Sequence, residues 1–328
     1  MTEPFPPQTT LPSILVGVLP SLLVEPNDPG WTSRAKFAWD EFFGGEIANG
    51  HTRAAYLGAV TRFLTWCEGA GVRLPQVTPG HVGHYIGQLN RSVPTKKLAL
   101  AAIRHCFDTL VRRHVLVLNP AHSVRAERYT VVEGKTPEIG VEGARKLLQS
   151  IGSVNVVALR DRAVIAVLIY TAVRVSAVTK LRLKDFRRDG TQYTLRFSEK
   201  GGKSREIPVR HDLEQFLSEY LAAVDSDREE KDAPFFRSVL GRTKTLTVKV
   251  LTAEDACRMV KRRLKDAGLS SHLSPHSFRV TAITDLLNQG VPLEDVQCLA
   301  GHADPRTTRL YDRRQRAVTR NVVERISV

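Results

Sequence analysis

Between Leu183 and Val209 the hydrophobic pattern changes from the period of a helix to that of a strand. The stretches LKDF, QYTLRF and REIPV alternate polar and apolar residues, and RRDG and EKGGK separate them. Alternation bounded by glycine-containing turns predicts a three-stranded antiparallel sheet. On both sides of this block, apolar residues recur at three- and four-residue steps, as in amphipathic helices. The sequence therefore predicts a mainly α fold with one small antiparallel β-sheet and helices beyond it to the C-terminus.

The stretch RAERYTVVEGKTPEIG breaks the helical pattern and divides the chain in two. A chain of 328 residues exceeds the usual size of one compact domain, so two domains are expected. We expect a helical domain over residues 31–127, a linker over 128–137 and a mixed α/β domain over 138–328. Residues 1–30 are expected to form a mostly extended arm, because prolines flank and interrupt their apolar stretch LPSILVGVLPSLLV. That stretch is too short to span a bilayer, so no membrane partner is expected.

Two helix starts can be placed in the first domain. TRAAYLGAVTRFLTWCEGAG predicts a helix with Thr52 as its N-cap and a stop at residues 69–71. Thr78 and Pro79 suit the cap and the first turn of the next helix. The long segment after Ser92 predicts a basic amphipathic helix.

The charge balance indicates a partner that carries many negative charges. The chain has 48 Lys and Arg against 34 Asp and Glu, a formal net charge of +14 and a pI of about 9.9. Nucleic acid leads the candidate partners, although charge alone fits a solvated basic surface equally well. The cysteines form no C-x-x-C pair, which argues against a zinc site or a disulfide framework and fits a reducing cytoplasm; they are Cys67, Cys106, Cys257 and Cys298.

The segment SPHSFRV places two donors at the start of a helix. Ser274 is a natural N-cap and Pro275 suits the first helical position. His276 and Arg279, three residues apart, then share one face near the positive end of the helix. Such a pair can hold a phosphate, although a capped surface helix with an incidental arginine would show the same pattern.

Two further segments offer cations. TAVRVSAVTKL places Arg174 near the end of an apolar helix, where an unpaired guanidinium would be costly to bury. Arg174 therefore needs an anionic partner, and Asp161 or Asp185 could serve in a purely structural role. SEKGGK places Lys200 and Lys203 at a hairpin tip, where a flexible loop could bring an ammonium to a ligand, although most hairpin lysines improve solubility.

The segment LAGHADPRTTRLYDRR places a tyrosine close to a histidine. Gly301 and His302 are expected to end a short helix, and Asp304 and Pro305 to begin the next. Tyr311 would then lie two turns into that helix. Taken alone, such a tyrosine is usually a half-buried packing residue.

Together and in this order, these residues resemble the active-site signature of the tyrosine recombinases, the phage-integrase family of site-specific DNA recombinases. LAGHADPRTTRLY is similar to the family's Leu-Gly-His…Thr-Thr…Tyr segment. The resemblance covers about residues 137–315, and the helical segment before it resembles the family's core-binding domain. Ala172 and Ala177 depart from the family, which often has a glycine and an acid there. The resemblance assigns the catalytic residues Arg174, Lys200, His276, Arg279, His302 and Tyr311.

The resemblance implies that the chain cuts and rejoins duplex DNA through a 3′-phosphotyrosyl intermediate, with Tyr311 as the nucleophile. Arg174 and Arg279 would stabilise the charge on the phosphorane oxygens. Lys200 would protonate the leaving 5′-hydroxyl, and Lys203 is its rival for that role.

Two histidines share the remaining roles. His276 and His302 would accept the tyrosine proton or hydrogen-bond the phosphate, and the sequence does not separate these roles.

The family also implies partners and an assembly. The partner is double-stranded DNA at recombination sites, with no metal, ATP or other cofactor required. Four copies would assemble on two sites and exchange strands through a Holliday junction, whereas the free chain would be a monomer or dimer. The tail after Tyr311 would pack on a neighbouring copy, and an accessory protein is a further candidate partner. Candidate DNA contacts are Lys96, Lys97, Arg104 and Lys203.

Three other functions compete with recombination. Type IB topoisomerases share the catalytic chemistry, so DNA relaxation is one alternative. A non-catalytic DNA-binding protein with the same fold is the second, and an RNA-binding protein is the third.

Overall fold

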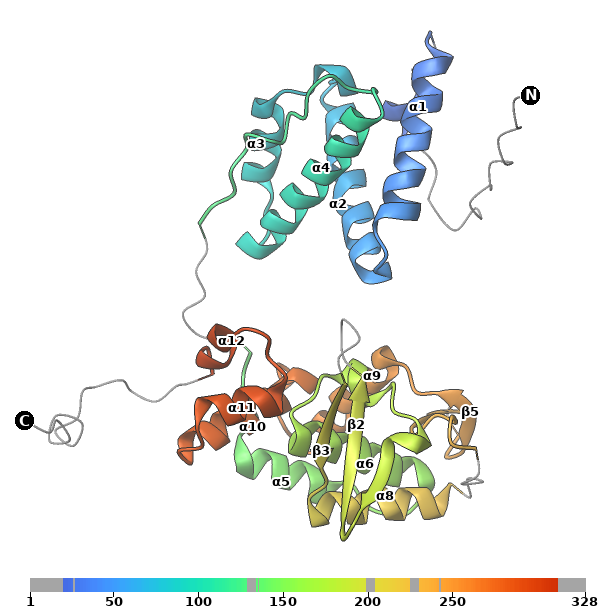
Figure 1. The fold of residues 1–328 in the computed structure, drawn as a ribbon, viewed down its shortest axis with the longest axis vertical. Helices are drawn as coiled ribbons and strands as arrows, with labels where there is room; N and C mark the ends of the chain where they lie inside the picture. The colour runs from blue at the N-terminus through green and yellow to red at the C-terminus, as the bar shows by residue number, and fades with distance from the viewer. Residues whose placement is uncertain are drawn as a thin grey trace, which may run out of the picture. The chain divides into compact units, whose positions relative to one another are not determined.

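The computed structural model describes residues 20–311 except 26, 129–133, 135, 199–203, 225–229 and 242. The chain divides into two compact units, residues 1–130 and 131–328 (Figure 1). Most described residues are helical and the sheets are small and antiparallel, which confirms the expected fold class. Across the described residues, no helix is both long and apolar enough to cross a membrane.

The first unit is helical throughout its described part. α2 and α4 lie against one another, and α1 and α3 both contact α4. The aromatic side chains of Phe63 and Phe107 meet edge to face in the core between α2 and α4. The elements are α1 (Pro29–Asp40), a π-helical turn (Glu41–Glu46), α2 (Gly50–Gly69), α3 (Pro79–Gln88) and α4 (Val93–Arg112).

Two boundaries in this unit differ from the sequence prediction. The N-cap of α2 is Asn49, whose carboxamide oxygen accepts the backbone N–H groups of His51 and Thr52. The predicted cap at Thr52 was therefore wrong, because a better acceptor stands three residues earlier. Before α1, Ser21–Leu23 forms a 3-10 turn and Leu23 is buried in the core, so this part of the chain does not extend away as an arm. Residues 1–19 lie outside the described residues.

The second unit surrounds one buried helix, α6 (Val156–Thr171). Its residues Val164 to Leu168 have no exposed surface, and the helix is apolar on nearly every face. It contacts α5, α8, α9 and α10. The other helices are α5 (Gly140–Ser150), α7 (Val175–Val178), α8 (His211–Ala223), α9 (Ala253–Asp266), α10 (Pro275–Asn288), α11 (Leu293–Ala300) and α12 (Pro305–Arg309).

The predicted antiparallel sheet is present and has the order β1-β2-β3. Leu195 pairs with Ile207 in the β2–β3 register, and both side chains are buried in the core. The strands are β1 (Phe186–Asp189), β2 (Gln192–Ser198) and β3 (Ser204–Pro208).

The structure corrects the sheet prediction in two places. Leu183–Asp185 is a 3-10 helix and not a strand, because the Asp185 carboxylate accepts the backbone N–H of Arg182 at 2.8 Å. A second hairpin, β4 (Arg237–Val239) and β5 (Leu246–Val250), interrupts the region expected to be wholly helical.

A buried charge cluster ties α6 to its neighbours. The Asp161 carboxylate, with no exposed surface, accepts hydrogen bonds from Arg160 at 2.5 Å, Arg263 at 2.9 Å and Arg262 at 3.0 Å. Arg160 is itself buried and donates to the backbone carbonyl of Arg237 at 2.9 Å. The Asp161 carboxylate thus joins α6 to α9, and Arg160 joins α6 to β4.

We expect Asp161→Asn to destabilise the second unit by about 3 kcal/mol, because removing one partner of a buried ion cluster leaves uncompensated charge. All three tryptophans, Trp31, Trp39 and Trp66, lie in the first unit. The unfolding transition followed by far-UV circular dichroism should therefore move to a lower urea concentration for the second unit. The transition followed by tryptophan fluorescence, which reports on the first unit, should stay in place. Glu142→Gln, which removes an exposed ion pair to Arg145, is the matched control and should change stability by less than about 1 kcal/mol. A shift in the fluorescence transition would contradict this account.

Candidate active site

α10 carries two of the predicted site residues. The helix begins as expected, with Ser274 at the N-cap and Pro275 at the first helical position. The backbone N–H of Ser274 donates to the hydroxyl of Ser277 at 3.1 Å, which fixes the first turn. His276 is exposed at this turn, and Arg279, one turn further on, is buried.

The turn between α11 and α12 carries His302, and Tyr311 follows α12. Gly301 ends α11 with a φ of +63°, a left-handed conformation that suits glycine. The Asp304 carboxylate accepts the backbone N–H of Arg306 at 2.9 Å and caps α12, as predicted. α12 ends at Arg309, so the expectation that Tyr311 lies two turns into a helix was wrong. Tyr311 is 8% exposed and packs in an apolar cluster with residues of α10.

The structure brings Tyr311 together with both histidines. The Tyr311 hydroxyl lies 3.3 Å from Nε2 of His276, within hydrogen-bonding distance. The ring of His302 stacks on the ring of Tyr311, with centroids 5.7 Å apart and an interplanar angle of 14°. The phenol is thus held between two imidazoles that come from α10 and from the turn after α11.

Arg279 is buried and has no carboxylate partner among the described residues. It is 1% exposed and donates through Nη1 to the backbone carbonyl of Ala172 and through Nη2 to that of Ala300, the latter at 2.6 Å. Its Nε is buried and has no hydrogen-bond partner. Burial, followed by the charge of Arg174, lowers the pKa of Arg279 to about 10, so the side chain remains cationic at neutral pH. A buried guanidinium with no counter-ion and a spare donor is suited to bind an anion.

Ala172 stands where the family often has a glycine, and its backbone has the left-handed conformation that glycine favours. It ends α6 with a φ of +50°, a conformation that costs an alanine about 1 kcal/mol. Its carbonyl accepts the bond from Arg279, and its methyl group packs in the same cluster as Tyr311. Ala177, in place of a common acid, lies in the apolar core.

Arg174 is exposed at the N-cap of α7. Within the described part of the chain, its side chain makes no hydrogen bond or ion pair. Asp161 binds the arginines of α6 and α9, and Asp185 caps a 3-10 turn. The purely structural role, in which one of these carboxylates pairs with Arg174, is therefore contradicted.

Desolvation and the two nearby arginines lower the pKa values of both histidines. Desolvation, then the charges of Arg279 and Arg174, lower the pKa of His302 to about 4. The same causes in the same order lower the pKa of His276. At neutral pH each imidazole is therefore neutral and carries one proton, so each can either accept or donate at a given nitrogen.

The low pKa of His302 predicts a loss of stability in acid. Between its unfolded pKa near 6.5 and its folded pKa of about 4, the unfolded chain binds more protons than the folded one. The free energy of unfolding should therefore fall as the pH is lowered through this window, by up to about 3 kcal/mol from this group. Urea titrations from pH 7.5 to 4.5 measure the slope. His302→Asn should have a shallower slope, and an unchanged slope would contradict the assignment.

The remaining predicted residues lie either outside the described part of the chain or in the first unit. Lys200 and Lys203 lie outside the described residues, in the connection between the paired ends of β2 and β3. In the first unit, Lys96 donates to the carbonyl of Gly87, and Arg104 donates to the carbonyls of Ala121 and Val124. Lys97 is exposed and makes no hydrogen bond with the described residues.

Arg205 is a residue near the site that the sequence analysis did not select. It lies on β3 and donates to the backbone carbonyls of Cys298 and Leu299 near the end of α11. Its charge also lowers the pKa values of His302 and Arg279. The only signal in the sequence was its position two residues after Lys203.

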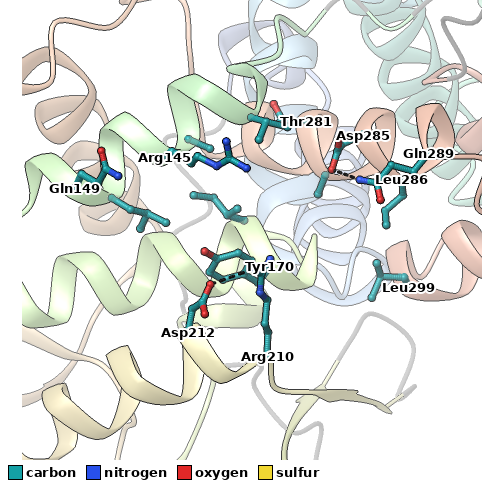
Figure 2. A pocket seen from close by; sticks show the side chains of 15 residues that line it. Arg145, Gln149, Tyr170, Arg210, Asp212, Thr281, Asp285, Leu286, Gln289 and Leu299 are labelled. Carbon is teal, nitrogen blue, oxygen red and sulfur yellow. Dashed lines mark hydrogen bonds and ion pairs between the residues drawn. The ribbon is translucent and has the colours of Figure 1, made fainter.

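A separate cavity of about 730 Å³ lies beside another part of α10 (Figure 2). Arg145 of α5, Tyr170 of α6 and Asp285 of α10 line it, and none of the predicted catalytic residues does. Among the described residues, no group of three or more histidine, cysteine or acidic side chains is placed to hold a metal ion.

Comparisons with known proteins identify the family of the chain. The family model described as "Phage integrase family" matches residues 141–317, more than half of the chain. The tyrosine recombinase XerD of Chlorobaculum tepidum is 28% identical over 84% of this chain and 89% of its own length. The tyrosine recombinase XerC of Chlamydia pneumoniae is 28% identical over 71% of this chain and 73% of its own length.

Solved structures agree with the fold. The XerH recombinase in a post-cleavage complex with a palindromic difH substrate has a TM-score of 0.64, is 21% identical and covers 85% of each chain. A lambda integrase tetramer bound to a Holliday junction has a TM-score of 0.64 and is 15% identical, covering 88% of this chain and 79% of its own.

The fold and these sequence matches define a class of enzyme, one that cuts and rejoins DNA in site-specific recombination. The chain belongs to the phage integrase family of tyrosine recombinases.

Proposed function

We propose that Tyr311 is the nucleophile of this recombinase. Its oxygen attacks the scissile phosphorus, forms a 3′-phosphotyrosyl bond and releases the 5′-oxygen of the next nucleotide, which takes up a proton. The single observation that carries this proposal is the Tyr311 hydroxyl, which lies 3.3 Å from Nε2 of His276. The buried Arg279 interacts electrostatically with the same tyrosine. The reverse attack by a 5′-hydroxyl restores the phosphodiester, so the bond energy is retained.

The geometry favours separate roles for the two histidines. A tyrosine hydroxyl that donates to His276 Nε2 requires the lone pair of that nitrogen, so His276 is placed to accept the phenol proton. His302 stacks on the tyrosine ring, and its Nδ1 is paired with Thr308 and not with the Tyr311 hydroxyl, so it suits a hydrogen bond to the phosphate.

Arg279 and Arg174 stabilise the pentacoordinate phosphate in this proposal. Two backbone carbonyls hold Arg279, whose Nε has no hydrogen-bond partner. Arg174 is exposed at the same site and has no anionic partner among the described residues. Preorganised donors of this kind act where charge develops in the transition state.

Lys200 donates the proton to the leaving 5′-oxygen in this proposal, with Lys203 as the rival. Arg205, two residues after Lys203, donates to backbone carbonyls at the end of α11 near His302, so the start of β3 lies close to the site.

We further propose the family's domain roles and assembly. Residues 31–127 bind DNA as a core-binding domain, with Lys97 as the exposed candidate contact; residues 128–137 link it to a catalytic domain over 138–328. Four copies assemble on two sites, as in the lambda integrase tetramer, and residues 312–328 pack on a neighbouring copy. The free chain is a monomer or dimer. The proposed setting is a mobile genetic element in a cytoplasm, and the four free cysteines support the reducing compartment.

The test begins with selection of the site. Tyr311→Phe protein selects bound duplexes from a random pool, and two copies of the selected sequence are then placed in a supercoiled plasmid. Wild-type protein in EDTA should delete or invert the intervening DNA. Relaxed plasmid without rearrangement would favour a topoisomerase, and no change in the DNA would contradict the proposal.

A further inference from the structure

Thr308 is a fully buried residue that contacts two residues of the candidate site. Its hydroxyl lies 2.9 Å from Nδ1 of His302. Its backbone carbonyl accepts the N–H of Tyr311 at 3.0 Å. One residue of α12 thus holds both His302 and the tyrosine.

The direction of the Thr308–His302 hydrogen bond follows from the available partners. A threonine hydroxyl has one proton, and Nδ1 of His302 is the one partner of this hydroxyl in the described structure. If Nδ1 carried the imidazole proton, the hydroxyl proton would be buried without an acceptor. Such an unpaired donor costs about 1–3 kcal/mol. The hydroxyl therefore donates to Nδ1.

A neutral histidine that accepts at Nδ1 carries its proton on Nε2. His302 has the low pKa described above, so the neutral form is the relevant one. Nε2 of His302 is the ring nitrogen that does not face Thr308, and no described residue is hydrogen-bonded to it.

We propose that Thr308 is a positioning residue that fixes His302 as the Nε2-protonated tautomer, so that His302 presents an N–H to a phosphate oxygen. The phosphate part of this proposal rests on the proposed function. In the proposed function His276 has the opposite tautomer, with Nε2 accepting from the Tyr311 hydroxyl, which lies 3.3 Å away. Two histidines that flank one phenol thus differ in role because each has a different hydrogen-bond partner.

The tautomer can be measured without any DNA reaction. Full-length protein labelled with ¹⁵N-histidine is recorded at pH 7.5 by long-range ¹H–¹⁵N correlation, and the His302 signals are assigned by their loss in His302→Asn. Wild-type protein should show a protonated Nε2 and an unprotonated Nδ1 at His302. A protonated Nδ1 would overturn the proposal, whether or not the protein cleaves DNA.

Variants then test whether the tautomer matters for cleavage. Thr308→Val keeps the shape but removes the hydroxyl, and should lower the cleavage rate about 10- to 100-fold while mixing the His302 tautomers. Thr308→Ser restores the donor and should recover the rate to within a few-fold, which a packing role would not require. Thr307→Val is the matched control, because the Thr307 side chain makes no hydrogen bond among the described residues.

Two results would overturn the positioning role. One is a Thr308→Val protein that is folded by circular dichroism and cleaves at the wild-type rate. The other is a Thr308→Ser protein that is folded and has the wild-type tautomer but cleaves as slowly as Thr308→Val. If no variant or wild-type protein cleaves any selected duplex, the proposed function fails, and the spectrum still decides the tautomer.

Discussion

Tyr311→Phe protein is expected to bind its DNA site with unchanged affinity and to form no covalent complex with it. Phenylalanine keeps the ring that stacks on His302 and packs against α10, so the fold should be retained. The phenol oxygen is the proposed attacking atom, and no other group can replace it in the chemistry. A duplex nicked near the scissile phosphate traps the adduct, because the short fragment with the free 5′-hydroxyl diffuses away. The adduct is then counted on a denaturing gel.

The matched control is Tyr170→Phe. Tyr170 is a partly buried tyrosine of the same unit that lines the separate cavity in Figure 2, and its loss should leave cleavage unchanged. If Tyr311→Phe bound less DNA in proportion to its lost cleavage, the tyrosine would serve binding and not attack. A purely DNA-binding protein would lose nothing in either variant.

Arg279→Lys is expected to lower the cleavage rate on the order of a thousandfold. A lysine keeps the positive charge, but its three donors extend from one nitrogen and lack the planar fork of arginine, so it cannot reach the carbonyls of Ala172 and Ala300 and a phosphate together. DNA affinity should change little, because non-specific affinity comes from many phosphate contacts. Single-turnover cleavage with nicked duplex measures the rate, and gel shift measures the affinity.

Arg306→Lys is the control for this variant. Arg306 is highly exposed, and its ion pair with Asp304 is of the surface type that contributes little. Its cleavage rate should match that of wild type. If Arg279→Lys and Arg306→Lys behaved alike, the buried guanidinium would have no special role at the phosphate.

Local patterns predicted much of the fold because they depend on nearby residues. Gly301 and Asp304 were placed correctly at a helix end and a helix start, since each acts on its own turn. The three-stranded sheet was likewise visible as alternation. The hairpin β4–β5 was missed because its strands are short and contain no fully buried residue, so burial does not alternate along them.

The candidate site residues could be selected from the sequence, but their contacts could not. His276 and Arg279 could be paired from their spacing on one helix, whereas the contact of Tyr311 with His276 joins residues 35 positions apart. The roles of Asp161, Arg205 and Thr308 depend on long-range packing or on a hydrogen bond across a turn, and no sequence pattern marks them. The separation of the two histidine roles likewise required the partners that the structure places beside each ring.

The central claim is that Tyr311 becomes bonded to the 3′-phosphate of DNA. The most direct measurement digests the wild-type adduct with nuclease and trypsin and locates the nucleotide by mass spectrometry. Trypsin should release the peptide of residues 310–313, which contains Tyr311 as its one tyrosine. The account predicts a nucleotide joined through its 3′-phosphate to this peptide and a free 5′-hydroxyl on the other fragment. A nucleotide attached to any other peptide, or joined through a 5′-phosphate, would contradict it.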